Sequence, residues 1–210
     1  MEFRLLDIEH LAEEYGLGEH LTHDMWLDDR YREYRASTGI CCRYYQLFYK
    51  IAELYKPRYV VELGSYWATA AAHFAAGCSD ADVVTIDAHR EIHPSDDVAW
   101  RKAREAADHY DNLQFVHGWT TTTLGGHTIA WINTRSYPID ILFMDAGHEY
   151  ESITKEWELY SPLLADEALI VIDDICNKDM VRFWDELDCE KFINGLLHSG
   201  HPMGFARFVR

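Results

Sequence analysis

From Arg58 onward, the sequence alternates short apolar segments with segments whose apolar residues recur at helical spacing. Each short segment is almost continuously apolar, which is typical of strands buried on both faces of a sheet. Such alternation predicts parallel strands, because right-handed crossovers place the connecting helices on the two faces. The sequence therefore predicts a doubly wound α/β fold. The expected strands are RYVVEL (58–63), DVVTID (82–87), LQFVH (113–117), IDILFMD (139–145), EALIVID (167–173) and the final GFARFVR (204–210).

Residues 1–57 lack this alternation and are expected to be helical. One helix is predicted to stop at Gly16, and another, 40–56, to end before Pro57, because proline disfavours helix in the residue before it. We therefore expect an N-terminal helical cap (1–57) and a main domain (58–210). The further expected helices are 67–77, 95–110 with Ser95 as its N-cap, 151–164 and 179–187.

Composition excludes several classes of protein. Acidic residues outnumber basic ones, 36 to 19, and the formal net charge of -17 argues against a surface for nucleic acid or anionic membranes. No run of 18 apolar residues predicts a membrane span, and the acidic N-terminus does not resemble a signal peptide. The five scattered cysteines form no CxxC motif, so we expect a reduced, cytoplasmic protein without a disulfide framework.

The ends of the first two strands favour a nucleoside ligand. Glu62 and Gly64 stand at the end of the first strand, where a glycine lets a ligand approach the backbone. Asp87 ends the second strand 23 residues after Gly64, a spacing suited to a ribose hydroxyl pair, while the absence of GxGxxG counts against NAD. The alternatives are an ordinary tight turn for the first pair and a surface or capping acid for Asp87.

After the third strand, Gly118 and Trp119 are placed to border a flat base, with the indole ring offering its face. Packing of Trp119 beneath a loop is the alternative.

Three aspartates follow the fourth and fifth strands. Asp145 and Asp173 are 28 residues apart, so neighbouring strands would bring them to roughly 5 Å from each other. Three such carboxylates repel one another unless one is protonated or a divalent cation neutralises them. Oxygen ligands without cysteine favour Mg2+, with Ca2+ or Mn2+ as alternatives, and Asp174 could instead cap the next helix.

His148 follows Asp145 in the same loop. A histidine in this position can take a proton near neutral pH. It could instead cap the helix that begins near Glu149, or lie in solvent.

The segments VVELGS, VTIDAH, ILFMDAGHEYES, LYSPLLADEALIVIDDI and VRFWDEL together resemble class I S-adenosylmethionine-dependent methyltransferases. Within that superfamily they are similar to macrocin- and mycinamicin-type sugar O-methyltransferases and to cephalosporin-hydroxylase-like proteins. The most specific likeness is DAGHEY (145–150) followed by Asp173 and Asp174. The resemblance implies a Rossmann-like, mostly parallel sheet of seven strands, preceded by N-terminal helices.

The resemblance also implies a cofactor site at the ends of the first four strands. Its residues would be Glu62, Gly64, Ser65, Asp87, Gly118, Trp119 and Asp145. The first three would line the methionine part of S-adenosylmethionine, the next would hold the ribose, and the glycine–tryptophan pair would border adenine. Two positions depart from the pattern: Ala68 replaces the usual second glycine, and Trp119 stands where an acid or hydroxyl is common.

By the same resemblance, Asp145, Asp173 and Asp174 match magnesium ligands, and His148 matches the proposed base. The resulting hypothesis is Mg2+-assisted O-methylation of a small-molecule hydroxyl, such as that of a sugar or glycosylated natural product. The metal would orient the acceptor oxygens and favour the alkoxide, while His148 takes the proton. Alternatives are a metal-dependent hydrolase or hydroxylase-like enzyme and a non-catalytic cofactor-binding protein; relatives of this type often form homo-oligomers.

Overall fold

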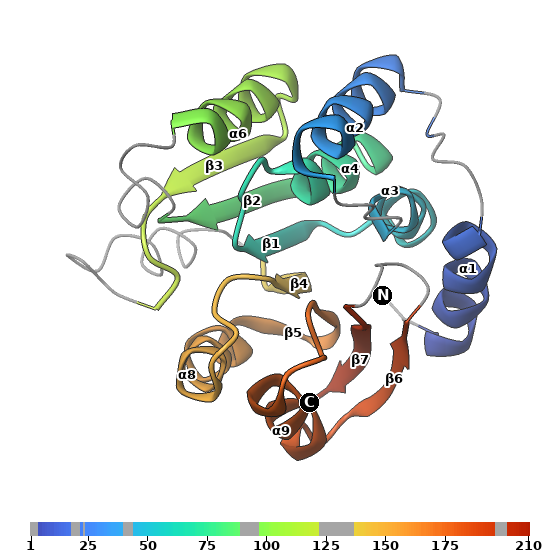
Figure 1. Cartoon of the computed structure of the whole chain (residues 1–210). Helices are drawn as coiled ribbons and strands as arrows, with labels where there is room; N and C mark the ends of the chain where they lie inside the picture. Colours follow the sequence, from blue (N-terminus) through green and yellow to red (C-terminus); the bar gives the residue numbers. More distant parts are fainter. Residues whose placement is uncertain are drawn as a thin grey trace.

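The computed structural model of the chain describes residues 4–17, 22, 24–39, 44–88, 97–121, 137–195 and 201–210. Within these residues, seven strands form one sheet in the order β3-β2-β1-β4-β5-β7-β6 (Figure 1). Four of the pairings are parallel and the two that involve β7 are antiparallel, so the predicted doubly wound, mostly parallel fold is confirmed. The strands are β1 (Tyr59–Leu63), β2 (Asp82–Asp87), β3 (Leu113–His117), β4 (Ile139–Met144), β5 (Leu164–Ile172), β6 (Glu190–Asn194) and β7 (Met203–Val209).

The central strands form where the sequence is most continuously apolar. β1 and β4 are buried along their whole length, as strands covered on both faces must be. β2 and β3 span the predicted residues. The sequence did not predict β6, a partly exposed edge strand of five residues, EKFIN, whose apolar content is low.

The helices also follow the predictions, with shifted ends. α4 begins at Thr69 and not at 67, because Tyr66 and Ala68 adopt positive φ values of 44° and 54°. α8 ends at Tyr160 and not at 164, and a short 3-10 helix follows, because Pro162 disfavours helix in the residue before it. The expected cap Ser95 lies outside the described residues. The helices are α1 (Leu5–Leu17), α2 (Met25–Thr38), α3 (Tyr44–Tyr55), α4 (Thr69–Gly77), α6 (Asp97–His109), α8 (Tyr150–Tyr160) and α9 (Lys178–Glu186).

Helices cover both faces of the sheet. Figure 1 shows α2, α3, α4 and α6 on one face and α8 and α9 on the other. Each face has its own hydrophobic cluster: Phe48 and Phe74 stack in the first, and Trp157 and Phe183 pack in the second. The N-terminal helices thus share the core of the first face. No helix in the described part of the chain is long and apolar enough to cross a membrane.

The order of the strands reverses between β1 and β4. From this boundary, β1, β2 and β3 follow one another toward one edge, and β4 and β5 toward the other. In such sheets, ligands bind outside the carboxyl ends of the strands at the reversal point. The segments after β1 and β4 are therefore the expected place for a functional site.

Candidate active site

A cavity of about 840 Å³ lies at the carboxyl ends of β1, β2, β4 and β5. This volume falls within the roughly 300–1,000 Å³ that is usual for ligand sites. Gly118 and His148 do not belong to the lining. The predicted site residues that line the cavity are Glu62, Gly64, Ser65, Asp87, Trp119, Asp145, Asp173 and Asp174.

Gly64 allows the backbones after β1 and β4 to meet. Its φ of +93° favours glycine, and an added Cβ would lie 2.1 Å from the carbonyl oxygen of Asp145. The Asp145 amide donates to the Leu63 carbonyl at 2.8 Å, which continues the ladder past the end of the strands. The sequence predicted a glycine that lets a ligand approach, whereas the close neighbour in the structure is the protein's own backbone.

Glu62 is a buried acid held by hydroxyl groups. It is 2% exposed, and the Thr85 hydroxyl donates to its carboxylate. The Thr85 hydroxyl also lies 2.5 Å from the Ser65 hydroxyl. Burial raises the pKa of Glu62 well above its ordinary value, and the hydrogen bond from Thr85 opposes this rise.

Asp87 supports the loop between β1 and α4. Its carboxylate accepts the backbone amide of Tyr66 at 2.6 Å, across the segment in which Tyr66 and Ala68 have positive φ. Trp119, which follows β3, is 37% exposed and faces the same cavity. Trp119 therefore forms part of the cavity wall. Gly118 contributes by donating its amide to the Asp87 carbonyl at 2.9 Å.

The three aspartates follow the ends of the neighbouring strands β4 and β5. Met144 pairs with Ile172 in the parallel register, so Asp145 and Asp173 follow neighbouring positions. The Asp173 amide donates to the Met144 carbonyl at 3.1 Å. The alternative role of Asp174 as a helix cap is wrong, because Asn177 caps α9 by accepting the Met180 amide at 2.9 Å.

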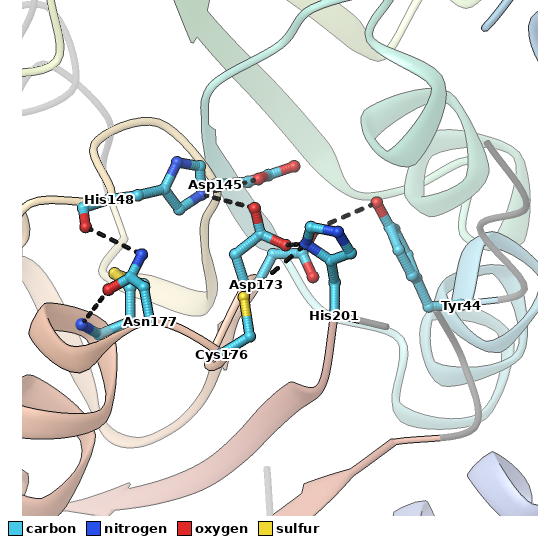
Figure 2. Close-up of polar contacts among 9 residues, drawn as sticks. Tyr44, Asp145, His148, Asp173, Cys176, Asn177 and His201 are labelled. Atoms are coloured by element: carbon cyan, nitrogen blue, oxygen red, sulfur yellow. Dashed lines mark hydrogen bonds and ion pairs between the residues drawn. The ribbon is translucent and has the colours of Figure 1, made fainter. Parts of the chain in front are cut away.

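His148 does not line the cavity but lies behind Asp145 and Asp174, whose carboxylates it contacts. Its Nε2 lies 3.6 Å from Asp145 Oδ1 and 3.5 Å from Asp174 Oδ2 (Figure 2). Glu149 occupies the N-cap position of α8, so His148 does not cap that helix. The Asn177 side chain donates to the backbone carbonyl of His148 at 3.3 Å and thereby links the two loops.

Burial and mutual contacts together shift the pKa values of Asp145 and His148. Burial, followed by the charge of Asp173, raises the pKa of Asp145 to about 7. Hydrogen bonding to Asp145, opposed by burial, raises the pKa of His148 to about 9. In the metal-free chain, His148 is therefore a cation at neutral pH and partly balances the acids.

Sequence reasoning missed three residues at the site. His201 Nδ1 lies 2.5 Å from Asp174 Oδ1, and Cys176 Sγ lies 3.9 Å from the same nitrogen. Glu156, on α8, lines the cavity with 1% exposure and accepts the Thr120 hydroxyl through Oε1. Burial raises the pKa of Glu156 to about 7. Only Cys176 carried a signal in the sequence, because it stands two residues after Asp174.

Two sets of side chains near the cavity could bind different kinds of metal ion. Asp145, Asp173 and Asp174 supply the oxygen atoms that Mg2+ prefers, and all three line the cavity. The more compact set within the described ranges is Asp174, Cys176 and His201, whose candidate ligand atoms all lie within 4.8 Å of one another. The three aspartates are the predicted set, but among the described residues only the mixed set brings three ligand atoms within 4.8 Å of one another, and that set was not expected.

Comparison with known proteins gives one family and one fold. A family model described as a methyltransferase domain matches residues 61–175, more than half of the chain. No curated protein sequence matches. An O-methyltransferase from Bacillus cereus in complex with SAH is 13% identical, with a TM-score of 0.63 over 96% of this chain and 97% of that one.

Two further solved structures have the same fold. An O-methyltransferase from Streptomyces achromogenes, involved in tomaymycin synthesis and in complex with SAM, is 15% identical, with a TM-score of 0.64 over 98% of this chain and 99% of that one. A methyltransferase from Geobacter sulfurreducens is 18% identical, with a TM-score of 0.64 over 98% and 100%. All three align along nearly the whole of both chains, so the sheet and the N-terminal helices have counterparts in them.

Proposed function

The chain belongs to a methyltransferase domain family, and from this premise we propose that it transfers the methyl group of S-adenosylmethionine (SAM) to a hydroxyl of a small molecule, assisted by Mg2+ or another hard divalent cation. The observation that carries the proposal is the single cavity that joins the nucleoside-type residues after β1 and β2 to the three aspartates after β4 and β5. The neighbouring structures described as O-methyltransferases support oxygen as the acceptor atom.

The donor would occupy the side of the cavity next to β1 and β2. Glu62 and Ser65 offer polar groups for the methionine part, and Asp87 offers a carboxylate for the ribose hydroxyls. Trp119 offers its ring to adenine. The amino and carboxylate groups of SAM need both acceptors and donors of hydrogen bonds, and Glu62 and Ser65 can supply them.

The acceptor would lie between the donor and the three aspartates. When bound there by Asp145, Asp173 and Asp174, a divalent cation would lower the pKa of an acceptor hydroxyl and fix its orientation. The aspartates themselves exclude anionic acceptors from this side unless a cation is present. A polyhydroxylated acceptor, such as a sugar of the macrocin or mycinamicin type, would suit this arrangement.

His148 is the group that we propose to hold the released proton. His148 Nε2 contacts the carboxylates of Asp145 and Asp174, which line the cavity. Asp145 could therefore pass a proton from the acceptor to His148. In the metal-free chain its pKa of about 9 keeps it protonated. Compensation of the aspartate charge would lower this pKa and make the imidazole available as a base at neutral pH.

The N-terminal helices would form the acceptor side of the cavity. Tyr34, Ser37 and Thr38 of α2 and Tyr44 of α3 belong to its lining. The Tyr44 hydroxyl donates to Asp173 Oδ2 at 3.5 Å, which links the proposed cap to the acids. We therefore propose that residues 1–57 select the acceptor.

The test is methyl transfer from SAM labelled in its methyl group to a panel of sugars, glycosides and catechols with adjacent hydroxyls. We expect labelled product that requires Mg2+ and disappears with a chelator. Asp145→Asn and Asp173→Asn should lower Mg2+-dependent turnover by about 100-fold or more. Asp166→Asn, at the exposed opposite end of β5, is the matched control and should keep full activity. Full chelator-resistant turnover in both cavity variants would refute the proposed role of the cation.

A further inference from the structure

The turn after β5 brings three chemically different donor atoms together. Asp174 Oδ1 lies 2.5 Å from His201 Nδ1, and Cys176 Sγ lies 3.9 Å from that same nitrogen (Figure 2). All three candidate ligand atoms lie within 4.8 Å of one another. A carboxylate, an imidazole and a thiol therefore point at a common volume.

The backbone holds these donors in place independently of their side-chain contacts. Asp174 adopts the left-handed conformation, with φ of 57°, which a short polar side chain such as that of aspartate tolerates. The Cys176 amide donates to the Asp174 carbonyl at 2.6 Å, so the turn is tight. The Ile175 amide donates to the Pro202 carbonyl at 2.9 Å, which ties the turn to the residue after His201.

The donor types select a class of metal. Thiolate and imidazole ligands favour divalent transition metals such as Zn2+ and Co2+, whereas Mg2+ and Ca2+ favour oxygen. In a tetrahedral zinc site, bonds of about 2.0–2.3 Å place neighbouring ligand atoms roughly 3.3–3.7 Å apart. The Cys176–His201 separation of 3.9 Å is already close to this. Asp174 Oδ1 and His201 Nδ1 are now 2.5 Å apart. To bind the same zinc ion, they would have to move apart by about 1 Å.

A metal ion could reach this site from solvent and would keep an open coordination position. Cys176 and His201 are exposed and Asp174 is partly exposed, so no buried segment must open. Three protein ligands leave a fourth tetrahedral position for water or another molecule. A further nitrogen is close by: His148 Nε2 lies 3.5 Å from Asp174 Oδ2.

We infer that Asp174, Cys176 and His201 form a binding site for a divalent transition-metal ion of the Zn2+ class, at the edge of the cavity and distinct from the set of oxygen ligands. This site depends on its own donors and not on the proposed methyl transfer. Because Asp174 belongs to both sets, an ion bound at the mixed site would compete with a hard cation for that carboxylate. The competing explanation is an Asp174–His201 ion pair beside an ordinary exposed thiol.

Cobalt titration distinguishes the two explanations. The full chain, stripped with a chelator and kept reduced at pH 7.5, is titrated with Co2+ and followed by absorption spectroscopy. We expect a thiolate-to-cobalt charge-transfer band in the near ultraviolet that saturates at one equivalent. An equal concentration of Zn2+ should abolish the band, and the same concentration of Mg2+ should leave it unchanged.

Variants assign the ligands. Cys176→Ser should abolish the charge-transfer band, and His201→Ala should weaken Co2+ binding at least tenfold. Cys189→Ser, which changes a thiol outside the cluster, is the matched control and should keep the band. Circular dichroism checks that each variant is folded. Absence of the band in the parent chain, or its persistence in Cys176→Ser, would overturn the inference and leave the ion pair as the explanation.

Discussion

The two sides of the cavity bury carboxylates in different ways. Next to β1 and β2, Glu62 accepts the Thr85 hydroxyl, which also lies 2.5 Å from the Ser65 hydroxyl. After β4 and β5, Asp145 and Asp174 contact the imidazole of His148. The first arrangement supplies hydrogen bonds and the second supplies positive charge.

Because of this difference, the two sides of the cavity suit different ligands. A hydroxyl donates to a carboxylate but brings no positive charge to offset burial, and burial raises the pKa of the acid. Glu156, which accepts the Thr120 hydroxyl, belongs to the same type. An imidazolium can be replaced by a metal ion, because both neutralise the same oxygen atoms. The hydroxyl-held side therefore suits the polar groups of a nucleoside-type cofactor, and the imidazole-held side suits a metal cation.

The largest effect is expected at Gly64, which joins the two sides. In Gly64→Ala, the new Cβ would lie 2.1 Å from the Asp145 carbonyl oxygen in a backbone with φ of +93°. We expect a loss of about 3–5 kcal/mol in the free energy of unfolding, measured with urea. Gly39→Ala is the control: Gly39 also has positive φ, +73°, but nothing lies within 4 Å of its added Cβ. This control should lose only about 1–2 kcal/mol, and equal losses would show that the contact between the two sides is unimportant.

Glu156→Gln tests the hydroxyl-held type of acid. The folded-state pKa of about 7 lies above the ordinary 4.5, so the folded chain keeps a proton that the unfolded chain releases. Stability of the parent should therefore fall as pH rises from 4.5 to 7. At pH 8 the glutamine variant should be more stable than the parent by up to about 3 kcal/mol, and this advantage should vanish at pH 4. Urea unfolding at both pH values measures it, with the exposed Glu158→Gln on the same helix as control; a pH-independent difference would contradict the explanation.

His148→Gln tests the imidazole-held side. Contact with Asp145 raises the pKa of His148 from 6.5 to about 9, so its stabilising effect is complete below 6.5 and is lost as pH rises through 9. Allowing for the partial exposure of the ring, we expect the variant to lose about 1–2 kcal/mol at pH 7 in the presence of a chelator. The loss should shrink at pH 10, and also at pH 7 with excess Mg2+. His117→Gln, at the exposed end of β3, should show neither dependence.

The smallest effect is expected at Ala68, in the loop that Asp87 supports. Ala68 has φ of +54°, which costs alanine about 1–2 kcal/mol, whereas glycine adopts it freely. Greater freedom in the unfolded chain offsets about 0.4–1 kcal/mol of that gain. Loss of the buried Ala68 methyl group, which is 0% exposed, offsets about 0.8 kcal/mol more. Ala68→Gly should therefore change the free energy of unfolding by less than about 1 kcal/mol, measured by thermal unfolding, whereas Ala71→Gly, equally buried within α4, should destabilise the protein by more. Equal destabilisation in both variants would mean that the left-handed conformation is not strained.

The sequence predicted what depends on local pattern. β2 and β3 were placed correctly because apolar runs with clear ends determine a buried strand. The meeting of Asp145 and Asp173 was predictable because both follow strands that are consecutive in the chain and adjacent in the sheet. The charged edge strand β6 has little apolar content and was missed.

The residues that depend on contacts distant in sequence were not predictable. His201 reaches Asp174 only because β7 returns antiparallel beside β5. Glu156 has the pattern of an ordinary helical acid, and its burial depends on where α8 packs. The close approach of the Asp145 backbone to Gly64 was also not predictable, because no local pattern in the sequence indicates it.

Binding of SAH and Mg2+ to two crossed variants tests the division of the cavity most directly. Calorimetric titration of each ligand into the full chain should show that Asp87→Asn weakens SAH about tenfold or more and leaves Mg2+ unchanged. Asp173→Asn should weaken Mg2+ by a similar factor and leave SAH unchanged. The asparagine at 87 can still accept the Tyr66 amide, so the loop should remain in place. Failure of the parent chain to bind SAH, or equal loss of both ligands in each variant, would contradict a cavity with a nucleoside side and a cation side.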